Sequence, residues 1–309
     1  MVNAAVACYV QVDVFTGGKG IRIGAEDLGL RARYDSSGDM RYDGRLDLHK
    51  AALNMLPVTG GVELLSHSQL PSGSGLGASG ALDVALVAAV ARTRGEWYDR
   101  AELAELGFHL EHVELKQLGG RQDQYAAALG GFHQLSFDGS GVVPRSLAIS
   151  PEQARDLTAH LVLVYTGESH FSSATHQRVW AGYHEGRPEI IEALHSIKDI
   201  ARRLVVPFET GDWREVARLV DEHWVQQQRL DATTSTPATQ TIERAARAAG
   251  AWGIKATGAG AGGCLFALCP PDRRAEVAGA ITRAGGTVME VGFDFEGVAT
   301  WEVGDDAGG

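Results

Sequence analysis

The chain has 309 residues, of which 44% are hydrophobic and 22% are charged, and its formal net charge is -11 at pH 7. This length and composition allow a large core, in one large domain or in two closely packed lobes. The acidic balance argues against nucleic acid or an anionic membrane as the main partner. It still permits an anionic small molecule, because a local site can be positive on an acidic protein.

Cysteine spacing and apolar runs predict a cytoplasmic protein. Cys8, Cys264 and Cys269 form an odd set without metal-ligand spacing, so we expect reduced thiols in the core. No apolar run is long and uncharged enough to span a bilayer. The N-terminus lacks the basic segment that begins a signal peptide.

The first part of the chain favours β-structure and the second part favours helices. Alternating valines after Ala5 predict a strand over Ala5–Phe15 with one buried face. Asp99 and Glu102 predict a capping box at the start of a helix that runs to about Leu118. Other expected strands are Gly29–Tyr34, Val62–Gln69, Phe132–Phe137 and Leu161–Tyr165. The expected helices are Leu46–Leu56, an all-round apolar and therefore buried Ser79–Arg94, three or four helices between Ser172 and Ala248 broken at Pro188, Pro207 and Pro237, and Arg273–Ala284 among the last strands.

A glycine-rich loop lies directly before the buried helix. Seven of the ten residues after Pro71 are glycine or serine. Glycine lets the backbone approach a ligand closely, and a helix N-terminus offers unpaired N–H groups and partial positive charge. Gly73, Gly75, Gly77 and the helix that starts at Ser79 therefore favour a phosphate cradle. The alternative is a glycine-rich surface turn before a core helix; a Walker A loop is excluded because no Gly-Lys-Ser/Thr follows.

The loop resembles the second motif of the GHMP kinase superfamily, Pro-x-x-x-Gly-Leu-Gly-Ser-Ser-Ala. The superfamily includes galactokinase, homoserine kinase, mevalonate kinase and phosphomevalonate kinase. The resemblance implies that ATP binds to Pro71, Gly73, Ser74, Gly75, Leu76, Gly77, Ala78 and Ser79. Ala78 replaces the first serine of the motif, and Ser79 keeps the second, which the family associates with nucleotide-bound Mg²⁺.

Three acids near this loop are candidates for the chemistry. Asp83 lies one turn further along the helix, where a buried acid is costly without a partner, and we favour a structural partner over a metal-ligand role. Glu111 lies at the distance from the next motif where family members carry their Mg²⁺-binding glutamate. Glu114 is the alternative, and either acid could instead belong to a solvated helix face. Mg²⁺ prefers such oxygen ligands and keeps several waters.

Asp123 lies in the glycine-flanked segment Gly119–Gly131. A lone aspartate there is commonly a turn residue, but two flanking glutamines and a small-residue helix suit a tight cleft. The segment resembles the Gly-Lys-Gln-Asp-Gln-Tyr-Ala-Ala signature of sugar-1-kinases, above all the D-glycero-D-manno-heptose 7-phosphate kinases. The resemblance implies that Asp123 orients or deprotonates the sugar hydroxyl beside Arg121, which replaces the family lysine with a different geometry. It places Gln122 and Tyr125 at the substrate.

Two further segments extend the resemblance. Lys255–Cys264 has four glycines among small residues, where a hairpin would need only a two-residue turn. It resembles the third GHMP motif, which packs against the phosphate loop. The resemblance implies that Gly258 and Gly260 belong to the nucleotide site. Tyr165–Gln177 resembles the Tyr-Thr-Gly-x-Ser-Arg segment of the heptose phosphate kinases and places Tyr165, Gly167 and His170 at the substrate. His170 replaces the family arginine, so the identity of the sugar stays open.

The resemblance covers nearly the whole chain, from Val2 to about Val303, but the family's first motif is absent before Asn3. Either the true start lies upstream, or part of the sugar site has been lost. We expect an α/β (α+β) fold with an N-terminal ATP-binding lobe over residues 1–160, related to ribosomal protein S5. A ferredoxin-like C-terminal lobe over residues 161–303 and a disordered tail over residues 304–309 follow.

The function implied by the resemblance is ATP- and Mg²⁺-dependent phosphorylation of a sugar or sugar phosphate at the anomeric hydroxyl. We expect a cytoplasmic monomer or homodimer that binds neither nucleic acid nor membrane. Two alternatives remain. One is another GHMP kinase of the homoserine or mevalonate type. The other is a catalytically weak paralogue that binds sugar and nucleotide.

Overall fold

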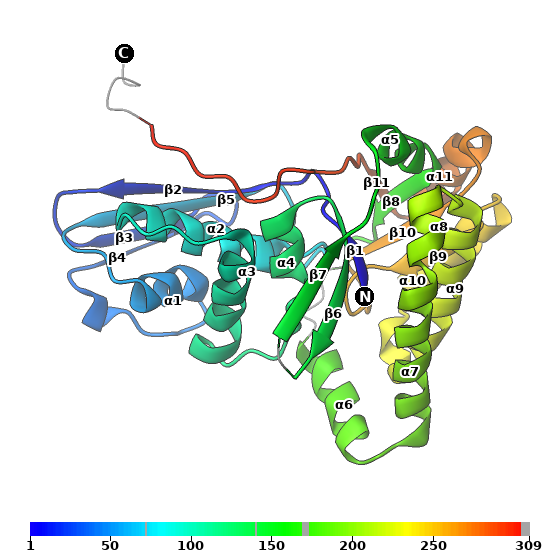
Figure 1. Ribbon diagram of the computed structural model, residues 1–309, viewed down its shortest axis with the longest axis horizontal. Helices are drawn as coiled ribbons and strands as arrows, with labels where there is room; N and C mark the ends of the chain where they lie inside the picture. The colour runs from blue at the N-terminus through cyan, green and yellow to red at the C-terminus, as the bar shows by residue number, and fades with distance from the viewer. Residues whose placement is uncertain (72, 140, 169–172, 304–309) are drawn as a thin grey trace. The chain divides into compact units, whose positions relative to one another are not determined.

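The computed structural model describes residues 1–71, 73–139, 141–168 and 173–303, and it divides into two compact units (Figure 1). Unit 1 contains Met1–Cys8, Leu70–Ala78 and Gly131–Asp294. Unit 2 contains Tyr9–Gln69, Ser79–Gly130 and the chain from Phe295 onward. The units interleave along the sequence, whereas the predicted lobes are contiguous; the lobe boundary at residue 160 stays a prediction.

Unit 2 is built on a mixed four-stranded sheet of order β2-β5-β3-β4. β3 pairs parallel with β5, and the other neighbours pair antiparallel. Helices α1 and α2 cover one face of this sheet (Figure 1), where Ile23 and Leu64 are buried. The strands are β2 (Val10–Thr16), β3 (Ile21–Ala25), β4 (Leu30–Tyr34) and β5 (Val62–Ser68), and the helices are α1 (Asp47–Met55), α2 (Ala78–Thr93), α3 (Arg100–His109) and α4 (Gln122–Leu129), with η1 (Ser37–Asp39) and the π-helical turn η2 (Leu110–Glu114).

Unit 1 contains two sheets. The sheet of order β11-β8-β10-β9 is antiparallel throughout, and its strand order and helical crossovers match a ferredoxin-like fold, as predicted. The second sheet has the order β1-β6-β7. The strands are β1 (Val2–Ala4), β6 (Phe132–Asp138), β7 (Gly141–Ser146), β8 (Leu161–Tyr165), β9 (Gly253–Ala256), β10 (Cys264–Leu268) and β11 (Thr287–Met289).

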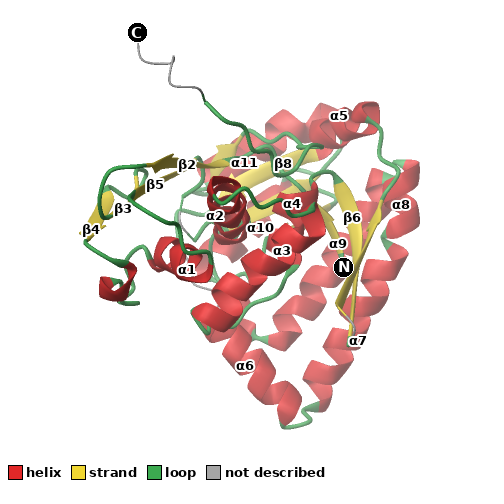
Figure 2. Ribbon diagram, turned by 60° about the vertical axis from the view of Figure 1, so that its left-hand side comes forward, coloured by secondary structure: helices red, strands yellow, loops and turns green. Residues whose placement is uncertain are grey.

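Helices α9, α10 and α11 of unit 1 pack against strands of the ferredoxin-like sheet, whereas α6 contacts α7 and extends away from the sheet (Figure 2). Pro188 and Pro237 are the first residues of α7 and α10, where a missing N–H costs nothing. Helix α7 ends at Arg203 and α8 begins at Val205, so the break predicted at Pro207 lies just before this residue, which occupies the first turn of α8. The helices are α5 (Pro151–His160), α6 (Ser173–His184), α7 (Pro188–Arg203), α8 (Val205–Thr210), α9 (Trp213–Leu230), α10 (Pro237–Ala248) and α11 (Arg274–Arg283), with η3 (Ala232–Thr234) and η4 (Pro271–Arg273).

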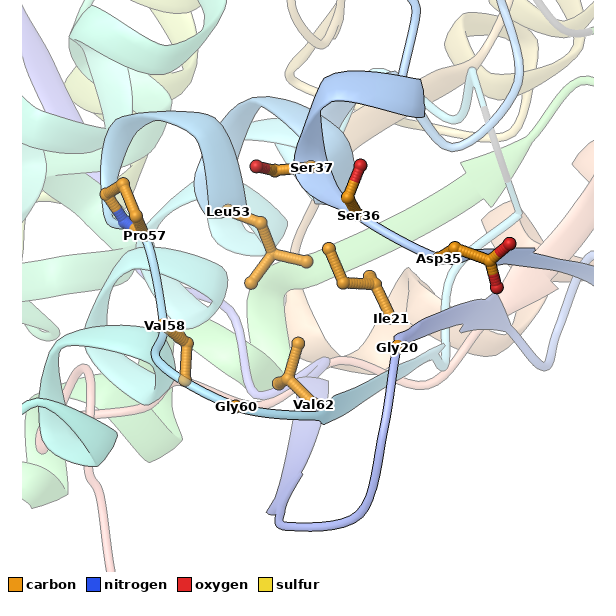
Figure 3. Close-up of a pocket in the computed structure, with 10 residues that line it drawn as sticks. All are labelled: Gly20, Ile21, Asp35, Ser36, Ser37, Leu53, Pro57, Val58, Gly60 and Val62. Carbon is orange, nitrogen blue, oxygen red and sulfur yellow. The ribbon is translucent and has the colours of Figure 1, made fainter.

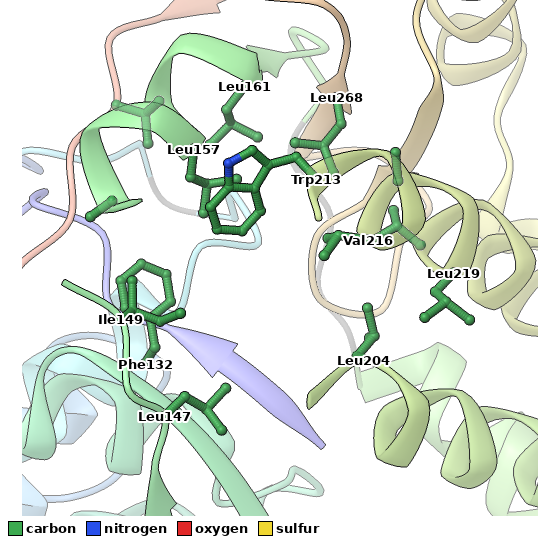
Figure 4. Close-up of a cluster of buried hydrophobic side chains, with 14 of the residues drawn as sticks. Phe132, Leu147, Ile149, Leu157, Leu161, Leu204, Trp213, Val216, Leu219 and Leu268 are labelled. Carbon is green, nitrogen blue, oxygen red and sulfur yellow. The ribbon is translucent and has the colours of Figure 1, made fainter. Parts of the chain in front are cut away.

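One core cluster of unit 1 packs around Trp213 at the start of α9 (Figure 4). The indole is 3% exposed, and its Nε1 donates to Asp156 Oδ2 at 2.6 Å. The bond satisfies a polar group that burial would otherwise leave without a partner. Cys264 and Cys269 are buried free thiols, as predicted, whereas Cys8 is a free thiol that is only partly buried.

The predicted strand from Ala5 to Phe15 is wrong as a single element. The chain forms β1, then pairs Val6 with Phe293 in an isolated bridge, and begins β2 only at Val10. Long-range partners therefore split one alternating pattern between the two units. Strand β3 was missed, although its alternation of Ile21 and Ile23 between glycines is a signal for a strand.

A small cavity in unit 2 lies beside the turn of η1 (Figure 3). Ile21, Leu53 and Val62 form its apolar wall, and Asp35 and Ser36 lie at its rim. Its volume of about 120 Å³ is below that of small-molecule pockets, which are typically about 300 Å³ or larger, so it is too small for a nucleotide. Among the described helices, none is long and apolar enough to cross a membrane.

Candidate active site

The phosphate loop, Gly73–Gly77, has the backbone that the sequence predicts. Gly73, Gly75 and Gly77 adopt φ values of +74°, +74° and +75°, a region that favours glycine. Ser74 is buried, and its hydroxyl oxygen has no hydrogen-bond partner within the described part of the chain. The loop runs directly into α2, whose first residue is Ala78 and whose first turn exposes Ser79.

The third-motif loop, Thr257–Gly263, lies against the phosphate loop within unit 1. The N–H of Cys264 donates to the Ser74 carbonyl at 2.7 Å. A Cβ added to Gly263 would lie 2.6 Å from the same oxygen, and a Cβ added to Gly75 would lie 3.1 Å from Thr257 Oγ1. The two loops therefore pack backbone to backbone, which requires glycine at both positions and fixes the shape of the phosphate loop.

Hydrogen bonds also join the predicted substrate segment after β8 to the third-motif loop. The N–H and the hydroxyl of Thr166 both donate to the Gly263 carbonyl at 2.9 Å, and Gly263 N–H donates to the Glu168 carbonyl at 2.7 Å. Tyr165 ends β8, and Gly167 has a φ of +83°. His170 lies outside the described residues. The substrate roles of Tyr165, Gly167 and His170 stay predictions.

An acidic cluster in unit 2 joins three helical segments. The amide of Gln124 in α4 donates to Asp83 Oδ2 of α2 at 3.1 Å and to Glu111 Oε2 of the π-turn at 3.0 Å. Burial and the nearby charge of Glu111 raise the pKa of Asp83 well above its usual range. Its other oxygen, Oδ1, is buried and has no hydrogen-bond partner among the described residues, which favours the protonated form of this acid. Asp83 therefore has a structural partner, as the sequence favoured.

Glu111 owes its direction to the π-helical turn Leu110–Glu114. The prediction that the helix continues to Leu118 is wrong: α3 ends at His109, and Lys116 adopts a φ of +54°, which a helix does not allow. Burial raises the pKa of Glu111, although hydrogen bonds from Ser79, Asp83 and Gln124 favour its charged form. Single π-helical turns of this kind are frequent at functional sites.

Glu114 belongs to different surroundings. It accepts a hydrogen bond from the Tyr42 hydroxyl at 3.3 Å and does not join the acidic cluster. The geometry therefore favours Glu111 over Glu114 as the cation ligand.

Asp123 packs directly on the first turn of α2. A Cβ added to Gly80 would lie 2.7 Å from Asp123 Cβ and 3.0 Å from the Gln124 nitrogen. Burial, and secondarily the charge of Glu111, raise the pKa of Asp123 from 3.8 to about 6. The side chain is only partly buried, so a substrate hydroxyl could reach it. A carboxylate with this pKa is largely ionised at neutral pH and is a competent proton acceptor.

Arg121 and Tyr125 both make bonds within the protein. Arg121 pairs with Glu105 at 3.1 Å and stacks over the Phe108 ring at 4.4 Å. The Tyr125 ring is buried, and its hydroxyl donates to Glu105 Oε1 at 2.8 Å. Glu105, which the sequence did not single out because nothing in its surroundings forms a motif, thus neutralises the charge of Arg121. The catalytic role of Arg121 and the substrate roles of Gln122 and Tyr125 stay predictions.

The side-chain oxygens of Ser79 and Glu111 could supply some of the ligands that a hard cation needs. The Ser79 side chain lies close enough to Glu111 to lower the pKa of that carboxyl. No group of three His, Cys, Asp or Glu in the described chain could hold a metal by itself. Mg²⁺ is commonly held by one or two protein oxygens together with waters and substrate phosphates, and Ser79 with Glu111 suits that arrangement.

Family models match both parts of the chain. The GHMP kinases N-terminal domain matches residues 47–131, and the GHMP kinases C-terminal domain matches residues 191–287. The mevalonate kinase of Thermococcus onnurineus is 34% identical over 79% of this chain and 70% of its own length. The chain belongs to the GHMP kinase family. The predictions of the family, of the fold class and of an ATP-dependent small-molecule kinase are thereby confirmed.

Two further relatives of this GHMP kinase match it almost from end to end. The D-glycero-alpha-D-manno-heptose 7-phosphate kinase of Campylobacter jejuni is 28% identical over 98% of the chain and 91% of its own length. The crystal structure of a D-glycero-D-manno-heptose 1-phosphate kinase from Bacteroides thetaiotaomicron has a TM-score of 0.80 at 25% identity. It covers 99% of this chain and 90% of its own.

Proposed function

We propose that this GHMP kinase transfers the terminal phosphoryl group of ATP to the anomeric hydroxyl of a sugar or sugar phosphate. The type reaction is conversion of a heptose 7-phosphate to a heptose 1,7-bisphosphate. The observation that carries the proposal is the position of Asp123 against Gly80, in the first turn of the helix that follows the phosphate loop. A proton acceptor is thus fixed to the same helix whose N-terminus attracts phosphate.

Phosphoryl transfer needs mainly positioning and charge neutralisation. Different groups of the site supply these two requirements. The phosphate loop and the start of α2 offer backbone N–H groups to the triphosphate. Asp123 accepts the proton of the attacking hydroxyl, and such a base contributes roughly 10²–10⁴-fold to the rate. Ser79 and Glu111 would hold Mg²⁺, which neutralises phosphate charge when bound. Gln124 holds Glu111 in place.

Two observations support a sugar phosphate as the acceptor. Two relatives that match nearly the full chain, at 28% and 25% identity, carry heptose phosphate kinase names. The segment from Arg121 to Tyr125 also matches the sugar-1-kinase signature except for its first residue. The second candidate is mevalonate, because several mevalonate kinases are 32–34% identical to this chain, although over only 77–79% of it.

A substrate panel tests the proposal. Purified protein with ATP and Mg²⁺ is assayed for ADP release with heptose 7-phosphate, other sugar phosphates that have a free anomeric hydroxyl, free sugars, mevalonate and homoserine. We expect turnover with a sugar phosphate and a new anomeric phosphate in the ³¹P spectrum. Turnover confined to mevalonate or homoserine would replace the proposal. Binding of ATP and sugar without ADP release would instead support a non-catalytic binding protein.

A further inference from the structure

Helix α9 contributes a buried glutamine to the third-motif loop. Gln227 is 7% exposed, and its Nε2 donates to the Gly258 carbonyl at 3.0 Å. Gly258, which supplies this carbonyl, has a φ of +54°. Residues that carry a side chain rarely adopt this backbone conformation. The bond fixes the orientation of a peptide that the chain does not hold by regular secondary structure.

The same residue touches the phosphate loop. A Cβ added to Gly258 would lie 3.3 Å from the Gly75 carbonyl oxygen and 3.7 Å from the Gly75 Cα. From the other side, Gly75 faces the Thr257 hydroxyl at close range. Gln227, Gly258 and Gly75 therefore form one continuous line of contacts from α9 to the phosphate loop, all of it within unit 1.

The amide of Gln227 contributes little to the stability of the fold. Its second polar atom, Oε1, is buried and has no hydrogen-bond partner among the described residues. A buried oxygen without a partner destabilises a fold, and an apolar side chain of the same length would fill the space without this cost. The contribution of the amide thus lies in its bond to Gly258.

The far side of the third-motif loop is held by backbone atoms. The N–H of Ala261 donates to the Thr234 carbonyl at 2.7 Å, and Ala261 has the unfavourable φ of +64°. Asp231 stabilises the turn that presents this carbonyl by accepting from the Thr233 N–H at 2.9 Å. A side-chain substitution does not remove the Thr234 contact, whereas substitution of Gln227 removes the contact at Gly258.

We propose that Gln227 is a positioning residue for the donor nucleotide, acting through Gly258 on the phosphate loop. The inference rests on the proposed function in so far as this loop binds ATP. Gln227 keeps the loop N–H groups aimed before ATP arrives, so that less ordering remains when the nucleotide binds. Loss of the amide weakens ATP binding without changing the acceptor site.

The test compares Gln227→Met with Gln226→Met. Methionine keeps the length of the side chain and removes its donor. The control lies on the same helix, where Gln226 accepts from Arg229 at 2.9 Å instead of contacting the loop. For Gln227→Met we expect the KM and the Kd for ATP to rise about fivefold, the value of one neutral hydrogen bond. The KM for the sugar and the thermal midpoint should stay at the wild-type values, and Gln226→Met should match wild type throughout.

Amide hydrogen exchange without ligands gives an independent readout. We expect faster exchange at residues 258–263 and 74–77 in Gln227→Met than in Gln226→Met. Wild-type nucleotide constants or unchanged exchange in Gln227→Met would overturn the inference. So would an equal rise in both KM values together with a lower thermal midpoint, since that pattern indicates a merely structural role. If wild type itself does not bind ATP, the proposed function fails, and the exchange result still decides whether Gln227 orders the loops.

Discussion

Replacement of Asp123 by asparagine should inactivate this GHMP kinase and stabilise it at the same time. The carboxyl has a pKa of about 6 in the folded state, against 3.8 for an aspartate in water. Folding therefore disfavours the ionised form, and the cost is present in full above pH 6 and fades as the pH falls toward 3.8. Asparagine cannot ionise and avoids this cost.

The size of the effect follows from the two pKa values. At pH 7.5 a difference of about two units corresponds to roughly 3 kcal/mol, and at pH 4.5 only about 1 kcal/mol remains. We expect Asp123→Asn to unfold in denaturant with a free energy higher than wild type by these amounts. Turnover should fall roughly 10²–10⁴-fold, while calorimetry shows ATP binding unchanged.

Glu114→Gln is the matched control, because it removes a neighbouring carboxylate that bonds Tyr42 outside the acidic cluster. It should keep both wild-type turnover and the wild-type dependence of stability on pH. Turnover of Asp123→Asn near the wild-type level would refute the base assignment. A variant no more stable than wild type at pH 7.5 would show that the environment of Asp123 does not disfavour its charge.

Three further outcomes are expected. In wild type, kcat/KM should fall below pH 6 with an apparent pKa near that of Asp123, about 6, because the protonated acid cannot accept the hydroxyl proton; a flat profile from pH 5 to 7 would contradict this. Gly80→Ala should displace Asp123, since the new Cβ would lie 2.7 Å from its Cβ, and lower kcat about tenfold or more while the KM for ATP changes little. Gly297→Ala should lower the free energy of unfolding, measured in denaturant, by about 2 kcal/mol or more. Gly297 has a φ of +69°, and the Cβ of the alanine would overlap the Ala128 carbonyl. A variant as stable as wild type would show that the chain around Gly297 can readjust.

Local chemistry explains what could be predicted. The glycines of the phosphate loop, the buried helix after it and the capping box at Asp99 each depend on a few neighbouring residues, and the structure has all of them. The ferredoxin-like half was predicted through family resemblance, and its strand order confirms it. Periodicity alone could not exclude a continuous strand from Ala5 to Phe15, because the bridge between Val6 and Phe293 joins residues far apart in the sequence.

The sequence by itself determined which residue types are available for phosphate, cation and proton. Closely spaced glycines before a helix and an aspartate between glutamines can be recognised without a fold, since their chemistry is local. Only the tertiary structure decided how these groups are supported: the π-turn that aims Glu111, the pairing of Arg121 with Glu105, and the bond from Gln227 to Gly258. Each of these contacts joins residues that are distant in sequence or depends on backbone geometry that no short pattern encodes, so it appears only when the packed helices bring the groups together.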